Sequence, residues 1–388
     1  MLGYILQQIL NGIQLGSIYA LIALGYTLVY GIIKLINFAH ADIFMVGAYI
    51  ALFLTAFYAG GTQTFPFQIW IWTSLIAGYL IFDILKFKLA FLKNFFLRLD
   101  RPSRKNSKRT MNAVVRACAN GFGIVLFSAL VFPFNFFFTK KLFSLPLGFF
   151  LFPLTILYVM LVCGILGSAM ERIAYRPLRY RGRLSALITA LGVSLFLENF
   201  CSQNMVFSSK YQAFPEIIKK ADLLRIPALD IVITNVFFLN IAVLAVLLAG
   251  LWLLVEKTLL GKQMRAVAFD KKTASLMGID IDRIISAAFI IGPALAGVSG
   301  ILYGMNYGIL QSPFLGFFPG IKAFIAAVLG GIGSLPGAVI GAFIMGISEV
   351  FANSIDSNLG FAAAFVILII ILLIKPTGIM GKSDSEKV

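Results

Sequence analysis

The sequence holds few charged residues, few cysteines and a single histidine. Charged side chains make up 12% of its 388 residues, whereas a soluble domain carries about 25%. Hydrophobic residues make up 60%, more than soluble packing can bury, so the solvent of this chain must be lipid. Cys118, Cys163 and Cys201 show neither metal spacing nor a disulfide pattern, and they are expected to be small core residues.

Sequence motifs that would indicate chemistry are also missing. His40 has no cysteine or carboxylate neighbour at ligand spacing, which argues against a metal site. No G-x-x-x-x-G-K-[ST] phosphate loop occurs, so the chain is not expected to bind ATP by that route. No nucleophile–base constellation is present, which disfavours a membrane-embedded enzyme. The first apolar stretch lacks a basic leader, so no cleavable signal peptide is expected.

Positive charge is abundant and concentrated in loops. The net charge is +16, but no aromatic platform accompanies the basic residues, so no nucleic-acid partner is expected. Residues 86–116 hold ten Lys or Arg and one acid, and residues 172–183 hold five Arg and no acid. Residues 256–283 hold six basic and four acidic groups. All three loops are therefore expected to be cytoplasmic, and the segment 208–230 external.

Long apolar stretches separate these loops, and each is close to the roughly 20 residues that span a bilayer. We predict an all-α polytopic membrane helix bundle, one transmembrane domain over 1–388, with about nine to ten membrane segments. The predicted spans are 5–33, 38–58, 66–85, 117–138, 147–170, 185–207, 231–255, 284–310 and 359–374.

The region 320–352 needs separate treatment. Its apolar run is interrupted by "GGIGSLPG", and its first half is too short to cross. The basic C-terminus is expected inside, which requires this region to enter and return. We predict a re-entrant Gly-rich hairpin, since a helix breaks at membrane depth only where protein or water satisfies its backbone. The alternative is one long kinked helix with the C-terminus outside.

Two further patterns lie inside the apolar regions. Glycines four residues apart (Gly12 and Gly16; Gly300, Gly304 and Gly308; Gly333, Gly337 and Gly341) indicate close helix packing. Asn37, His40 and Asp42 form a polar break between two apolar helices, either a functional site in the membrane or a capped turn at its surface. The candidate translocation-path residues are Asn37, His40, Asp42, Gly330, Gly331, Gly333, Ser334, Pro336 and Gly337.

The polar stretch "RAVAFDKKTASLMGID" in the loop 256–283 predicts a short helix. Asp270 is placed to cap its start, and Gly278 suits the left-handed position that ends it. Ala266, Asp270 and Ala274 lie four apart, with Met277 near the same face. Such a face fits either a groove on another protein or the chain's own bundle.

Five segments in order resemble a known family: "NFAHAD…GAY", "ERIAYRPLR", "LGVSLFLEN", "GKQMRAVAFDKKTASLMGID" and "KAFIAAVLGGIGSLPGAVIGAFIMGISE". They are similar to the permease subunits of bacterial branched-chain amino acid ABC transporters of the LivH type. The likeness implies that 256–283 is a cytoplasmic coupling loop that contacts the ATPase subunits. It assigns that role to Arg265, Ala266, Asp270, Ala274, Met277 and Gly278.

The chain departs from the resemblance at two places. Where the family usually has Gly-Glu after "NFAH", this chain has Ala41 and Asp42, so the acid is one carbon shorter. The chain also exceeds the family's usual length near 60–146. This excess reads as an inserted helical hairpin around the basic loop 86–116, part of which is expected to lie on anionic lipid.

The resemblance implies a membrane-spanning permease subunit of an ATP-driven importer, translocating small, branched-chain amino acids (Leu, Ile or Val) across the bacterial inner membrane. Its partners would be a second permease subunit, two cytoplasmic ATP-binding subunits and a periplasmic or lipid-anchored solute-binding protein. The chain itself would be non-catalytic and without a cofactor, with ATP bound by the partner subunits. The alternative is an ion- or proton-coupled secondary carrier of small solutes, with Asp42, Glu198 or Glu349 as its carboxylate.

Overall fold

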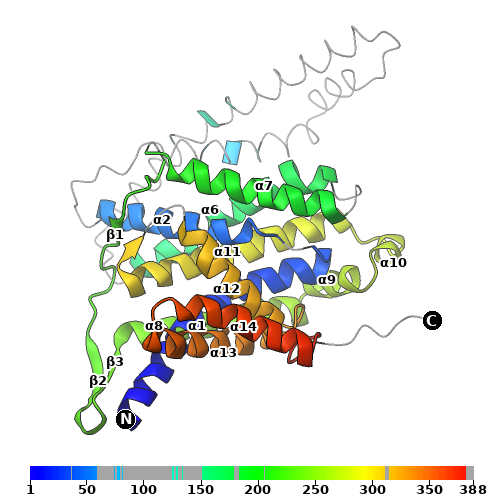
Figure 1. Ribbon diagram of the computed structural model, residues 1–388. Helices are drawn as coiled ribbons and strands as arrows, with labels where there is room; N and C mark the ends of the chain where they lie inside the picture. The colour runs from blue at the N-terminus through cyan, green and yellow to red at the C-terminus, as the bar shows by residue number, and fades with distance from the viewer. Residues whose placement is uncertain are drawn as a thin grey trace, which may run out of the picture. The chain divides into compact units, whose positions relative to one another are not determined.

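The computed structural model (Figure 1) is described here for residues 1–35, 37–58, 151–178, 183–204, 206–310 and 314–381, with single positions between 74 and 133. Packing divides the chain into two units, one of Met1–Ala59 with Phe152–Val388 and one of Gly60–Leu151. The predicted loop 86–116, and all but single positions of the predicted spans 66–85 and 117–138, lie outside the described residues. The first unit is described below.

Helices make up most of this unit, as expected for a polytopic membrane protein. Among the described residues, six helices are long and apolar enough to cross a membrane. A short π-helical turn, Glu171–Tyr175, and a 3-10 turn, Arg176–Leu178, follow α6. The helices are α1 (Leu2–Ile33), α2 (His40–Tyr58), α6 (Leu151–Met170), α7 (Arg183–Ser202), α8 (Asn235–Lys257), α9 (Leu259–Phe269), α10 (Lys271–Leu276), α11 (Ile281–Tyr307), α12 (Phe314–Gly330), α13 (Leu335–Ile355) and α14 (Leu359–Ile374).

Short strands lie at one end of the bundle. β1 (Gln212–Ala213) pairs antiparallel with β4 (Ile309–Leu310), and β2 (Asp222–Ile226) pairs with β3 (Ile231–Thr234). The prediction of a span from residue 231 is therefore wrong at its start. The β-branched run of β3 joins a ladder first, and the helix begins only at Asn235.

The helix α1 forms the centre of the unit, and it packs against α13, α11, α12 and α8. Nearly all of its apolar stretch is buried, whereas most of the apolar surface of α7 and α8 is exposed. In water such exposure would be costly, but it suits helices that face lipid. The expected interior cysteines Cys163 and Cys201 are both buried.

Glycines permit close helix contacts at most of the positions that their spacing indicated. Gly308 and Gly333 are exceptions: an added Cβ would meet nothing within 4 Å, and both have positive φ, so Gly308 ends α11 and Gly333 turns the chain. A Cβ added at Gly12 would lie 2.6 Å from the Ile347 Cα of α13, and one at Gly16 would lie 2.9 Å from the Phe343 Cα. A Cβ at Gly300 would lie 2.7 Å from the Ala48 N of α2. These side-chain-free positions bring α1 against α13 and α11 against α2, the kind of packing that joins helices in lipid.

The Gly-rich region forms a helical hairpin, so the alternative of one kinked helix is wrong. α12 and α13 lie side by side, and a Cβ added at Gly341 would meet the Gly330 N at 2.7 Å. Gly331 and Gly333 both have φ +101°, which a residue with a side chain rarely adopts, and so the chain reverses there. With 17 residues, α12 is about 25 Å long and short of the hydrocarbon core, whereas α13 with 21 is long enough to cross.

One end of the bundle gathers the segments that were expected to be cytoplasmic. The Lys271 Nζ of α10 donates to the Ile33 O at the end of α1, 3.0 Å away. The Ile379 N and Met380 N after α14 donate to the Leu329 and Gly330 carbonyls, each at 2.9 Å. Figure 1 shows α9 and α10 at this end and the N-terminus with β2 and β3 at the other. The hairpin thus returns the C-terminal segment to the side that its charge predicted.

Candidate functional site

The predicted loop helix is present, with the predicted cap and stop. Asp270 precedes α10, and its carboxylate accepts from the Lys272 N at 2.9 Å and from the Thr273 Oγ1 at 2.5 Å. Gly278 has φ +81°, and the Ile279 N bonds back to the Ala274 O at 3.1 Å. These bonds satisfy backbone groups that a helix end would otherwise leave without partners.

The single docking face predicted for this stretch is wrong. Asp270 ends α9 with an extended backbone as well as capping α10, so Ala266 and Ala274 belong to two different helices. Ala274 is buried against the bundle. The exposed residues are instead apolar: Phe269 (80% exposed), Leu276 (87%) and Met277 (78%), which we call the α10 surface.

Side chains of the same loop hold this surface to the bundle. Arg265 donates to the Val255 O and forms an ion pair with Glu256 of α8, with 3.2 Å between the Nη1 and Oε2 atoms. Lys271 joins α10 to the end of α1, as described above. A displacement of α10 would therefore act directly on the central helix α1, and on α8 through α9.

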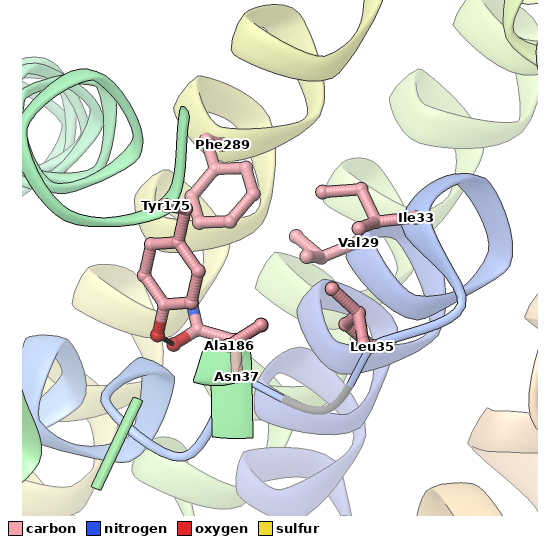
Figure 2. Close-up of a pocket in the computed structure, with 7 residues that line it drawn as sticks. All are labelled: Val29, Ile33, Leu35, Asn37, Tyr175, Ala186 and Phe289. Carbon is pink, nitrogen blue, oxygen red and sulfur yellow. Dashed lines mark hydrogen bonds between the residues drawn. The ribbon is translucent and has the colours of Figure 1, made fainter. Parts of the chain in front are cut away.

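The first polar break lies at the same end and is tightly packed. Tyr175, after α6, donates to the Asn37 Oδ1, and both are buried (Figure 2). They line a cavity of about 10 Å³, which is barely large enough for one water molecule. The other residues that line it are Val29, Ile33, Leu35, Ala186 and Phe289.

His40 and Asp42, the other polar residues of the break, are fully buried at the start of α2. The His40 ring lies against Tyr26, with 4.7 Å between ring centroids, and its Nε2 is 3.3 Å from the Ile22 O. Among the described residues, neither carboxylate oxygen of Asp42 has a hydrogen-bond partner. Ser194 and Glu198 of α7 are among the polar groups around it.

The second break, residues 330–337, forms the hairpin turn. The Ser334 Oγ caps α13 by accepting from the Gly337 N at 3.2 Å, and Gly330 packs on Gly337. Gly333 and Pro336 are exposed. A Cβ added at Gly31 of α1 would lie 3.8 Å from the Gly333 Cα, so both breaks approach the end of α1. Their assignment to the translocation path stays a prediction.

Sequence reasoning missed a largely buried ion pair between α12 and α13. The Lys322 Nζ of α12 lies 2.6 Å from the Glu349 Oε1 of α13, and the Tyr19 hydroxyl of α1 donates to the Glu349 Oε2 at 2.8 Å. The two charges are 27 residues apart, so no helical spacing connects them. The available signal was their rarity, since only Asp356 is also charged between 284 and 374.

A second polar cluster lies between α1, α8 and α11. The Asn306 Oδ1 accepts from the Gln14 Nε2 at 2.7 Å and from the Asn240 Nδ2 at 3.2 Å, and the Lys220 Nζ donates to the Asn306 O at 3.1 Å. Asn240 is fully buried. Polar side chains thus continue from the ion pair toward the end of the bundle that carries the strands.

Comparison with known proteins gives a consistent relationship. A family model described as the branched-chain amino acid transport system permease component matches residues 8–98 and 113–374. The high-affinity branched-chain amino acid transport system permease protein LivH of Escherichia coli K12 is 35% identical over 395 residues, which cover 99% of this chain and 98% of the relative. The corresponding permease BraD of Pseudomonas aeruginosa is 33% identical, with the same coverage.

A more distant relative is named for a different substrate. The guanosine ABC transporter permease protein NupP of Bacillus subtilis is 25% identical over 187 residues, 47% of this chain and 52% of the relative. No solved structure matches the chain significantly. The family model includes both predicted spans of the 60–146 region and leaves out only residues 99–112 of the loop between them. That 60–146 is an insertion stays a prediction.

Proposed function

Since the chain belongs to the branched-chain amino acid transport permease family, we propose that it is the membrane-spanning subunit of an ATP-driven importer of branched-chain amino acids in a bacterial inner membrane. The near full-length similarity to LivH and BraD carries this proposal. The chain would be non-catalytic and hold no cofactor of its own. The importer would also need a second permease subunit, two ATP-binding subunits and an external solute-binding protein.

The α10 surface is the proposed contact with the ATP-binding subunits. Three large apolar side chains (Phe269, Leu276 and Met277) are exposed at the end that the charge pattern places in the cytoplasm, outside the apolar spans. Burial of large apolar side chains in a groove of a partner stabilises a complex. Asp270 and Gly278 would fix the shape of the helix, and Arg265 its attachment to the bundle.

The test is co-purification of the assembled transporter together with ATP-driven leucine uptake in proteoliposomes. Leu276→Asp with Met277→Asp should remove the ATP-binding subunits and lower uptake about tenfold or more, because burial of each side chain contributes about 1.5–3 kcal/mol. Leu223→Asp, at an exposed apolar residue of β2, is the matched control and should retain those subunits. If the Leu276→Asp, Met277→Asp variant retained the ATP-binding subunits and took up leucine at the normal rate, the assigned contact would be rejected.

The secondary-carrier alternative makes an opposite prediction. A carrier would transport leucine without any ATP-binding subunit and would respond to a proton or ion gradient. Uptake by the purified chain alone, driven by such a gradient, would overturn the proposed importer. Dependence on ATP and on the partner subunits would exclude the carrier.

A further inference from the structure

The ion pair between Lys322 and Glu349 is costly for a membrane protein. The Lys322 side chain is 14% exposed and the Glu349 side chain 6%, and their charged atoms are 2.6 Å apart. Charged side chains inside a membrane are rare and mark substrate or ion pathways. Replacing a buried ion pair by apolar residues is often neutral or stabilising, so packing alone does not require this pair.

Hydroxyl groups surround the acidic member of the pair. Tyr19 donates to the second oxygen of Glu349, and Tyr303 and Tyr307 of α11 lie near the same carboxylate. Three helices besides α13 therefore converge here: α1, α11 and α12. A site where several membrane helices meet is a common position for the substrate of a transporter.

Aromatic rings lie beside the basic member. The Lys322 Nζ is 5.9 Å from the centroid of the Phe361 ring of α14, and Phe361 packs on Phe318 at 5.2 Å between centroids. The lysine thus has a carboxylate near it on α13 and an apolar wall on α14. This combination offers one anion, one cation and an apolar surface within a few ångströms.

We propose that Lys322 and Glu349 bind the α-carboxylate and the α-ammonium of the transported amino acid, respectively. The inference rests on the proposed function and adds the residues that recognise its substrate. An amino acid carries the same two charges as the pair, so it can separate the two side chains and give each a new partner. The site remains neutral overall in both states, and Phe361 and Phe318 would contact the apolar side chain.

The ion pair also holds α12 and α13 together when no substrate is bound, because the two side chains then bind each other. With substrate the charges are satisfied only if the amino acid carries both ionic groups. A neutral solute or a simple amine would leave one buried charge unpaired, which is strongly unfavourable.

The experiment compares variants in the assembled complex, reconstituted in proteoliposomes with the ATP-binding subunits and the binding protein. The double variant Lys322→Met with Glu349→Gln removes both charges together, so it leaves neither one buried alone. It should assemble and hydrolyse ATP, but its rate of labelled leucine uptake should fall by about tenfold or more. Leucinamide, which lacks the carboxylate, should inhibit leucine uptake poorly in the wild type. In Lys322→Met it should inhibit leucine uptake about as well as unlabelled leucine does.

Glu171→Gln provides the matched control. Glu171 is also a fully buried carboxylate, and it accepts from the Ser286 Oγ at 2.8 Å, but it lies next to the 172–183 loop. Its replacement should leave leucine selectivity unchanged. Selective leucine uptake at the wild-type rate in the double variant would overturn the inference while leaving the proposed function standing.

Failure of the proposed function gives a different result. A wild-type complex that assembles but takes up guanosine or a sugar instead of leucine would refute the proposed substrate class and, with it, the inference. If the single variants do not fold, the double variant and the conservative variant Lys322→Arg still decide the question. Lys322→Arg keeps the charge and should retain part of the uptake. If Lys322 had a purely structural role, its replacement would not change how well leucinamide competes with leucine.

Discussion

Asp42 and Glu349 are two buried carboxylates of the same bundle, and their surroundings differ. Glu349 has a lysine at 2.6 Å and a tyrosine hydroxyl at 2.8 Å. Asp42 has no cation beside it among the described residues, and its polar neighbours are the Ser194 hydroxyl and a second acid, Glu198. Burial of a charge is costly unless it is paired. The same residue class should therefore stabilise the fold at one position and weaken it at the other.

The largest effect is expected from breaking the ion pair on one side. Glu349→Gln leaves the Lys322 ammonium buried without its counter-charge, and such changes cost about 3–5 kcal/mol. Equilibrium unfolding in bicelles titrated with SDS would measure the loss. Adding Lys322→Met should restore most of the stability, because both charges are then absent. An equal loss in the single and the double variant would mean that packing rather than charge decides stability here.

A smaller effect is expected from the hydroxyl of Tyr19. Tyr19→Phe keeps the ring in place and removes only the hydrogen bond to Glu349, so it should cost about 0.6–1.7 kcal/mol, as interhelical hydrogen bonds in membranes do. The same unfolding titration measures it. In the Glu349→Gln background the cost should shrink, because the acceptor is no longer charged. An unchanged cost there would place the partner of Tyr19 elsewhere.

The helices were predictable from the sequence because lipid imposes a simple rule. Within the part of the chain that the structure describes, the predicted apolar spans are helices, and the charges of 172–183 and 256–283 indicated which ends lie together. Arg176 and Asp282, one from each loop, form an ion pair in the structure. The rules for helix ends were also readable from the sequence, so the cap at Asp270, the stop at Gly278 and the break within residues 330–337 were predicted correctly.

Contacts between distant residues could not be read in the same way. Lys322 and Glu349 belong to two legs of a hairpin, and their meeting depends on how α12 and α13 tilt against each other. The α10 surface was missed for a different reason. The four-residue spacing of Ala266 and Ala274 indicates one face only within one helix, and the Asp270 cap divides the segment into two.

The smallest effect is expected at Asp42. Asp42→Asn replaces the buried carboxyl by an amide of nearly the same shape and removes its electrostatic interaction with Glu198. The amide oxygen can still accept from the Ser194 hydroxyl, so stability should fall by less than about 0.5 kcal/mol or should rise. The SDS titration compares it directly with Glu349→Gln. Combined with Glu349→Gln, the two effects should add, because the two sites share no partner. A loss as large as that of Glu349→Gln would show that Asp42 is paired and that the two carboxylates are equivalent.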